Sequence, residues 1–171
     1  MKSPFGLVPR SLLCLGIPLV ITLHAPLALA AANCGVFSST LNFGNYDVLD
    51  PVPTDSTTNI LILCIRNPPP GIETVSYTLS LSAGTGSFAA RTMTNGPETL
   101  TYNLYANASR SSAAVWGDGS AGTVTVGGSL QPLTGQNPIR LASHTIYGRI
   151  PAQQDVAVGT YSANVILTMD Y

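Results

Sequence analysis

Lysine and histidine are nearly absent from this chain of 171 residues. Its lysine is Lys2, its histidines are His24 and His144, and charged residues make up only 9% of the sequence. Because so few positive charges cannot form a basic patch, nucleic acid and anionic lipid are excluded as partners. The apolar content of 45% is nevertheless too high for a disordered chain.

A secretory signal peptide is expected over residues 1–30. Two basic residues precede an uncharged apolar stretch, residues 11–23, as in the leaders of exported proteins. Ala28 and Ala30 then have the small-x-small spacing of a signal-peptidase site, which places cleavage after Ala30 or Ala32. We therefore expect the protein to be exported.

Two other interpretations of this leader fit less well. A membrane span needs about 20 apolar residues, whereas this stretch is shorter and contains Pro18. A lipoprotein site at Cys34 would need a small residue before it, and Asn33 stands there. Removal of the leader leaves residues 31–171 as one domain, in which five Arg and eight acidic residues give a net charge of −3.

Cysteine is scarce as well, with three in the chain. Cys14 lies in the leader, so the mature domain keeps the pair Cys34 and Cys64 in an oxidising compartment, where a disulfide is expected. Closing this loop stabilises a fold by roughly 3–4 kcal/mol in the chain-entropy model. A metal or redox site is the alternative, but the pair lacks both CxxC spacing and a neighbouring histidine.

No helical period of useful length occurs, and short alternating segments separated by Gly and Pro fill the mature domain. The expected strands lie within residues 39–46, 57–66, 73–84, 98–107, 122–129, 144–150 and 159–171. Residues 57–66 are a run of β-branched residues and leucine, for which we expect burial on both faces. This pattern predicts an all-β protein, and seven or so short strands predict a β-sandwich.

Catalytic and metal-binding patterns are weak. His144 is a lone histidine beside a strand, and residues 118–122 (DGSAG) approach a nucleophile elbow without its first glycine or a following helix. Asp47, Asp50 and Asp55 are spaced as turn residues among prolines rather than as calcium ligands. We expect no enzymatic activity, no cofactor and no metal.

Several motifs occur in one order along the mature domain. They are LNFGNYD after the first cysteine, ILILCIRN around the second, RTMTNGPETLTYNLYAN, VWGDG, YGRIPAQQ and the final GTYSANVILTMDY. Together these motifs resemble the spore coat protein U domain family, which includes pilins of archaic (Csu-type) chaperone–usher pili. The resemblance covers nearly all of residues 31–171.

The resemblance implies an incomplete immunoglobulin-like β-sandwich that lacks its last strand. Such pilins receive the missing strand from another chain, first a periplasmic chaperone and then a neighbouring subunit, after which an outer-membrane usher assembles them. The sequence agrees, because its final strand is amphipathic and nothing follows it to cover its apolar face. The expected function is that of a secreted structural subunit of a surface pilus.

The donor strand is expected to bind in a groove between the first and last strands. The predicted acceptor residues are Leu41, Phe43, Tyr161, Ala163, Val165, Leu167, Met169 and Tyr171. Cleavage of the leader would leave at most Ala31, Ala32 and Asn33 before Cys34, too few residues for a donor strand of its own. An acceptor-only subunit at the distal end of a fibre is therefore expected.

Two other classes of protein remain compatible with the sequence. A non-fibrous spore or cell-surface coat protein would share the fold. A secreted binder or enzyme on a complete sandwich would need a seventh strand from within the chain.

Overall fold

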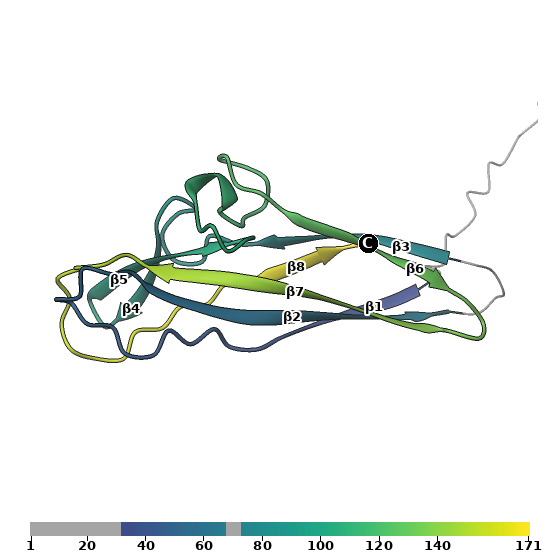
Figure 1. Cartoon of the computed structure of the whole chain (residues 1–171), viewed down its shortest axis with the longest axis horizontal. Coiled ribbons are helices and arrows are strands. Elements are labelled where there is room, and N and C mark those ends of the chain that lie inside the picture. Colours follow the sequence, from purple (N-terminus) through teal and green to yellow (C-terminus); the bar gives the residue numbers. More distant parts are fainter. Residues whose placement is uncertain (1–31, 68–72) are drawn as a thin grey trace, which may run out of the picture.

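The computed structural model describes residues 32–67 and 73–171, which form two β-sheets packed against each other (Figure 1). The signal peptide expected over residues 1–30 lies outside the described residues. The strands are β1 (Ala32–Ser38), β2 (Thr54–Arg66), β3 (Glu73–Leu81), β4 (Arg91–Asn95), β5 (Glu98–Tyr105), β6 (Val126–Leu133), β7 (Ile139–Ile150) and β8 (Leu167–Asp170). One 3-10 turn, η1 (Ser112–Ala114), is the only helical element among the described residues.

The larger sheet has the strand order β1-β2-β7-β5-β4, and the smaller sheet has the order β6-β3-β8. All strand pairs within the two sheets are antiparallel. Each strand alternates side chains between the interior and the surface, which is why the half-apolar, half-polar patterns of the sequence fold this way. The all-β sandwich predicted from the sequence is confirmed.

The interior of the sandwich is built from one face of each long strand. In β2, Ile60, Ile62 and Cys64 are completely buried, whereas Leu61 and Ile65 are 42% and 43% exposed. The prediction that residues 57–66 are buried on both faces is therefore wrong. The composition of the run gives no information on whether a second layer covers its outer side, and none of the described residues does so.

Two of the segments predicted as strands are extended but are wholly or largely outside any strand. Residues 39–46 belong to no strand, and within residues 159–171 only Leu167–Asp170 forms one. Both segments keep an alternating burial pattern, but they lack a neighbouring strand with which to form a ladder. Alternation predicts which side chains face the core, whereas a strand also needs a hydrogen-bonded partner.

The first segment connects β1 to β2, and the second connects the end of β7 to β8. Among the described residues, no helix is long and apolar enough to cross a membrane.

Candidate functional site

A groove of about 1080 Å³ runs between these two extended segments. One wall is formed by residues 38–48, after β1, and the other by residues 156–165 together with Leu167 at the start of β8. Large apolar side chains of both sheets line its floor, and each is at most 9% exposed: Leu81, Met93, Leu100, Tyr102, Leu104, Ile146 and Ile150. The floor of the groove is therefore formed by the core of the sandwich itself.

The backbone along both walls has free hydrogen-bonding capacity. Among the described residues, β8 pairs only with β3, and β1 pairs only with β2, so each has one open edge. Within residues 156–165 of the second wall, only Ser162 joins a neighbouring strand, through two bonds with Thr94 of 2.9 and 3.1 Å. Open edges of this kind are templates for another strand. The sandwich thus lacks one strand at this position.

The predicted acceptor residues are divided by the structure into two sets. Six of them line the groove: Leu41, Phe43, Tyr161, Ala163, Val165 and Leu167. Met169 and Tyr171 do not, because they lie beyond the end of the groove. Met169 packs on the core as part of β8, and the Tyr171 hydroxyl accepts a hydrogen bond from the Cys34 N–H at 3.3 Å. This bond joins the two open edges and closes one end of the groove.

Two further lining residues, Tyr46 and Val156, were not predicted from the sequence. The Tyr46 hydroxyl donates to the Pro151 carbonyl at 2.9 Å and accepts from the Gln154 N–H at 2.7 Å. The Gln154 side chain in turn bonds both backbone groups of Thr101 in β5. These bonds tie the first wall to β5 and to residues 151–154, which lead into the second wall. Val156 continues the alternation of the second wall, and this signal was available in the sequence.

Charge is nearly absent from the groove. Among the described residues that line it, Asp47 alone is ionisable with an acidic or basic side chain. The other polar groups are hydroxyls and amides of Ser, Thr, Asn and Tyr. A ligand that fits must therefore be elongated and apolar on one side, and it must offer backbone-like hydrogen-bonding groups to the open edges.

A disulfide fixes the edge strand beside the groove. Cys34 in β1 is bonded to Cys64 directly opposite it in β2. Cys64 is completely buried, so the bond forms part of the core beneath the closed end of the groove.

A buried arginine supports the groove floor from β4. Arg91 is completely buried, and its guanidinium donates to the carbonyls of Ser82 and Trp116 and to Oδ1 of Asn103, at 2.6 to 3.2 Å. Burial lowers the pKa of this guanidinium. Because Ser82 directly follows β3, these bonds join the small sheet to the large one next to the floor residue Leu81.

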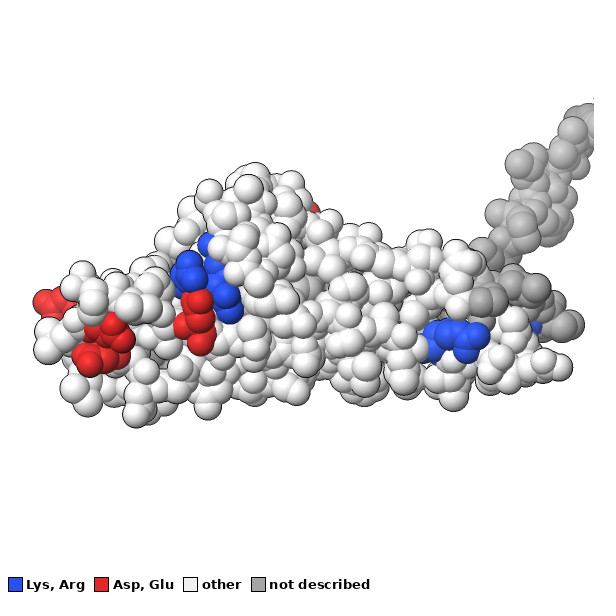
Figure 2. Space-filling view, viewed as in Figure 1, with Lys and Arg blue, Asp and Glu red and all other residues white. Residues whose placement is uncertain are grey.

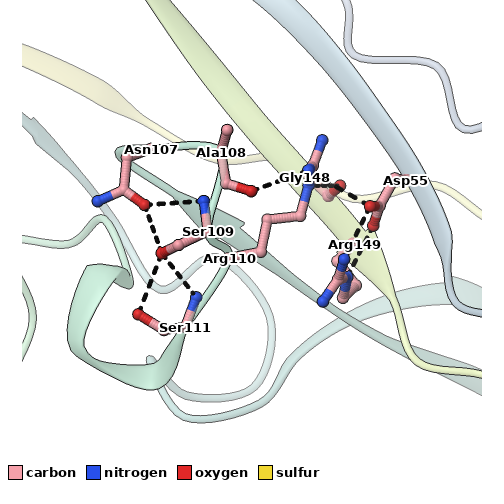
Figure 3. Close-up of polar contacts among 8 residues, drawn as sticks. All are labelled: Asp55, Asn107, Ala108, Ser109, Arg110, Ser111, Gly148 and Arg149. Carbon is pink, nitrogen blue, oxygen red and sulfur yellow. Dashed lines mark hydrogen bonds and ion pairs between the residues drawn. The ribbon is translucent and has the colours of Figure 1, made fainter.

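A second polar cluster ties the same end of the large sheet to a loop, as Figure 3 shows. Arg149 at the end of β7 makes two bonds to the Asp55 carboxylate in β2, of 2.7 and 2.8 Å. Arg110 approaches the same carboxylate at 3.3 Å and donates to the Gly148 carbonyl. The bond from Arg149, with the charge of Arg110, lowers the pKa of Asp55. None of these three charged side chains lines the groove.

The weak catalytic candidates have structural partners. The Nε2 of His144 lies 2.8 Å from the Tyr77 hydroxyl, a hydrogen bond that links β7 of one sheet to β3 of the other. Burial lowers the pKa of His144 and raises the pKa of Tyr77. Ser120 hydrogen-bonds Asp118 within a turn. Among the described residues, no cluster of three or more His, Cys, Asp or Glu is arranged to hold a metal.

Figure 2 shows how sparse charge is on one face of the molecule. Acidic groups gather at the end that carries β4 and β5, a mixed acidic and basic group follows, and the other end shows basic groups only. This face has no broad patch of one charge.

Comparison with known proteins gives two findings. A solved structure, the chaperone–tip adhesion subunit pre-assembly complex CsuC–CsuE of archaic chaperone–usher Csu pili from Acinetobacter baumannii, contains a similar chain, with a TM-score of 0.51 and 21% identity. The similarity covers 82% of this chain but only 40% of the other, so this chain spans less than half of its length and shares its fold. No curated protein matches. The family model of the spore coat protein U domain matches residues 20–168, and the chain therefore belongs to the spore coat protein U domain family.

Proposed function

We propose that the protein is a structural subunit of a surface pilus and that its groove accepts a donor strand from another chain. The observation that carries this proposal is the coincidence of two features in one place. Two strand edges without a partner in the described part of the chain flank the groove, and core side chains of both sheets form its floor. A small-molecule site would need neither the length of the groove nor its open edges.

The apolar floor of the groove determines the pattern of side chains that a donor strand must have. It alternates, with every second side chain apolar and directed at Leu81, Met93 and Ile146 on the floor. Four or five such side chains, at roughly 1.5–3 kcal/mol each, contribute about 6–15 kcal/mol before the cost of ordering the strand. This gross gain is comparable to the whole stability of a domain. The subunit alone is therefore expected to be poorly stable.

The family and the structural neighbour support the source of the strand that we propose. That neighbour is a tip subunit in complex with its chaperone, which supports a periplasmic chaperone as the first donor and a neighbouring subunit as the second. Export through a signal peptide over residues 1–30, assembly at an outer-membrane usher and a final place on the cell surface belong to the same proposal. The domain that carries the groove is residues 31–171.

We also propose that this subunit accepts a donor strand but gives none to a neighbour. Ala32 already pairs with Arg66 as the first residue of β1. With cleavage after Ala30, no free segment long enough for a donor strand precedes β1. A subunit that accepts a strand and gives none belongs at the distal end of a fibre. A non-fibrous coat protein of the same family remains the second candidate, because the family takes its name from a spore coat protein.

The proposal is tested by producing the full chain in a periplasm with and without the cognate chaperone. We expect a soluble subunit–chaperone complex in the first case and degradation or aggregation in the second. A soluble, stable monomer without any chaperone would show that the sandwich is complete without a donor, and it would overturn the proposal. Loss of fibres when the gene is deleted would then separate a pilus subunit from a coat protein.

A further inference from the structure

The outer face of the large sheet carries a second apolar surface, separate from the groove. Residues of β1, β2 and β7 that point away from the core lie opposite one another in three rows, given by the strand register. The rows are Asn33–Ile65–Ile139, Gly35–Leu63–Leu141 and Phe37–Leu61–Ser143. We call the six large apolar residues of these rows the apolar face: Phe37, Leu61, Leu63, Ile65, Ile139 and Leu141.

This surface is exposed to an unusual extent. Five of its residues are between 42% and 58% exposed: Phe37, Leu61, Ile65, Ile139 and Leu141. With roughly 200 Å² for each such side chain, about 500 Å² of apolar surface is open to solvent. This area is near the upper end of what a typical monomer exposes in one patch.

The apolar face is also flat and uncharged. An added Cβ on Gly35 would lie 3.4 Å from the ring of Phe37, so the ring packs over the glycine rather than standing away from the sheet. None of the nine positions in the three rows is ionisable. Further along the same outer face the residues become polar: Thr145 hydrogen-bonds Asn59 at 2.9 Å, and Arg149 binds Asp55. Outward positions of these strands therefore accommodate polar side chains elsewhere in the same sheet.

We propose that the apolar face binds a second copy of this chain, sheet against sheet. Two such faces bury about 1,000 Å² in total, the lower bound for a specific interface. A flat apolar surface is complementary to itself, as a two-fold interface requires, and two sheets pack in this way at about 10 Å. Since no ionisable group lies in the rows, no charge has to be desolvated at the centre of the contact.

The two copies can be related by a two-fold axis that passes beside Leu63, so that their β2 strands run antiparallel. This arrangement keeps the charged clusters of the two copies far apart. Asp55 lies eight residues from Leu63 along β2, or about 26 Å at 3.3 Å per residue. The two Asp55–Arg149 clusters then lie about 50 Å apart, beyond the range of mutual repulsion at physiological salt. None of the apolar-face residues lines the groove, so a dimer leaves the groove open for a donor strand.

The test is the mass of the mature protein isolated from the periplasm, with whatever chaperone accompanies it. Light scattering after size exclusion, from about 1 to 100 µM, follows the association. We expect the mass of two copies, or of a 2:2 complex with chaperone, at the higher concentrations. The double substitution Leu61→Thr and Leu141→Thr places a β-branched residue, which suits a strand, at two exposed positions. We expect it to weaken dimerisation by at least about tenfold while the thermal midpoint of the dissociated protein changes little.

Ile166→Thr is the matched control. Ile166 is 69% exposed but does not belong to the apolar face. Its backbone N–H bonds the side chain of Ser82, which directly follows β3 in the small sheet. We expect this variant to dimerise like the unmodified protein. A single-copy mass at every concentration, or a dimer that survives the double substitution, would overturn the proposal. So would a 1:1 complex from which the double variant loses the chaperone, because the chaperone would then be what covers the apolar face.

Discussion

Gly148 shows how one residue shapes the groove. A Cβ at this position in β7 would lie 2.7 Å from the Phe43 ring and 2.9 Å from a Leu41 methyl. Both side chains therefore rest directly on the β7 backbone, and they form the wall without filling the groove. The alternation of Leu41 and Phe43 was visible in the sequence. The close approach at Gly148 was not, because it depends on a strand about a hundred positions away.

A charge in the groove wall is expected to prevent donor binding. Leu167→Asp would place a carboxylate in the half-buried wall, where an incoming donor would have to bury it without a partner. This burial costs several kcal/mol, enough to cancel much of the gain from the donor. Chaperone capture, measured by co-purification from the periplasm, should fail.

Ile166→Asp is the control for that substitution, since Ile166 is the neighbouring residue and its side chain is 69% exposed. It should be captured almost as well as the unmodified protein. If Leu167→Asp instead gave a soluble and stable monomer without a chaperone, the groove would not be a strand-binding site.

His144 is expected to make stability depend on pH. Its pKa in the folded protein is lowered from the ordinary value of 6.5 because of burial. The unfolded chain therefore binds a proton at a higher pH than the folded one, so stability is fully present above about pH 6.5 and falls as the pH drops through the lowered value. Asp55, with its lowered pKa, contributes only at more acidic pH, below 3.8.

Urea unfolding at about pH 5 and pH 8 measures this effect in the donor-bound protein. In the variant His144→Gln, which keeps a neutral partner for the Tyr77 hydroxyl, the difference between the two pH values should shrink. An unchanged difference would mean that another group controls it.

At the scale of elements, the sequence predicted extended segments better than it predicted strands. The alternation of residues 39–46 and 159–166 correctly marks which side chains face the core. It cannot show that both segments lack a ladder, because the partner strand is absent from the described residues. Nor can alternation show where the groove ends. Met169 and Tyr171 continue the pattern of Leu167, yet the Cys34–Tyr171 hydrogen bond closes the groove before them.

The disulfide between β1 and β2 is expected to hold the edge strand in place. Replacement of both Cys34 and Cys64 by serine should lower the free energy of unfolding by roughly 2–4 kcal/mol, because the unfolded chain gains conformational freedom. Denaturant titration of the donor-bound protein measures the loss. Mass spectrometry under non-reducing conditions checks the bond itself, and free thiols at both positions would contradict it.

At the scale of the whole molecule, two apolar surfaces are left uncovered, and they differ in what they require. The groove has core residues as its floor and is flanked by strand edges that have no partner among the described residues, so it needs a strand. The apolar face belongs to three strands that are already paired with one another, so it needs only another flat surface. The sequence indicated the first surface through its unpaired final strand. The sequence did not indicate the apolar face, because residues 57–66 of β2 have the composition of a strand that is buried on both faces.

A strand supplied within the chain is expected to stabilise the whole molecule. β8 ends at the closed end of the groove, so a short glycine-rich linker after Tyr171 would let about seven further residues turn back antiparallel to residues 156–167. With valine and threonine alternating, the added strand covers the floor and pairs with the open edge of β8. We expect a protein that is soluble without chaperone, with a thermal midpoint higher than that of the unmodified chain by roughly 5–15 °C, since a few kcal/mol correspond to a shift of this size in a domain of this length. The same extension with its central valine replaced by aspartate should bring no gain, because the carboxylate would be buried at the groove floor. Equal midpoints for the two extensions would mean that the added strand does not occupy the groove.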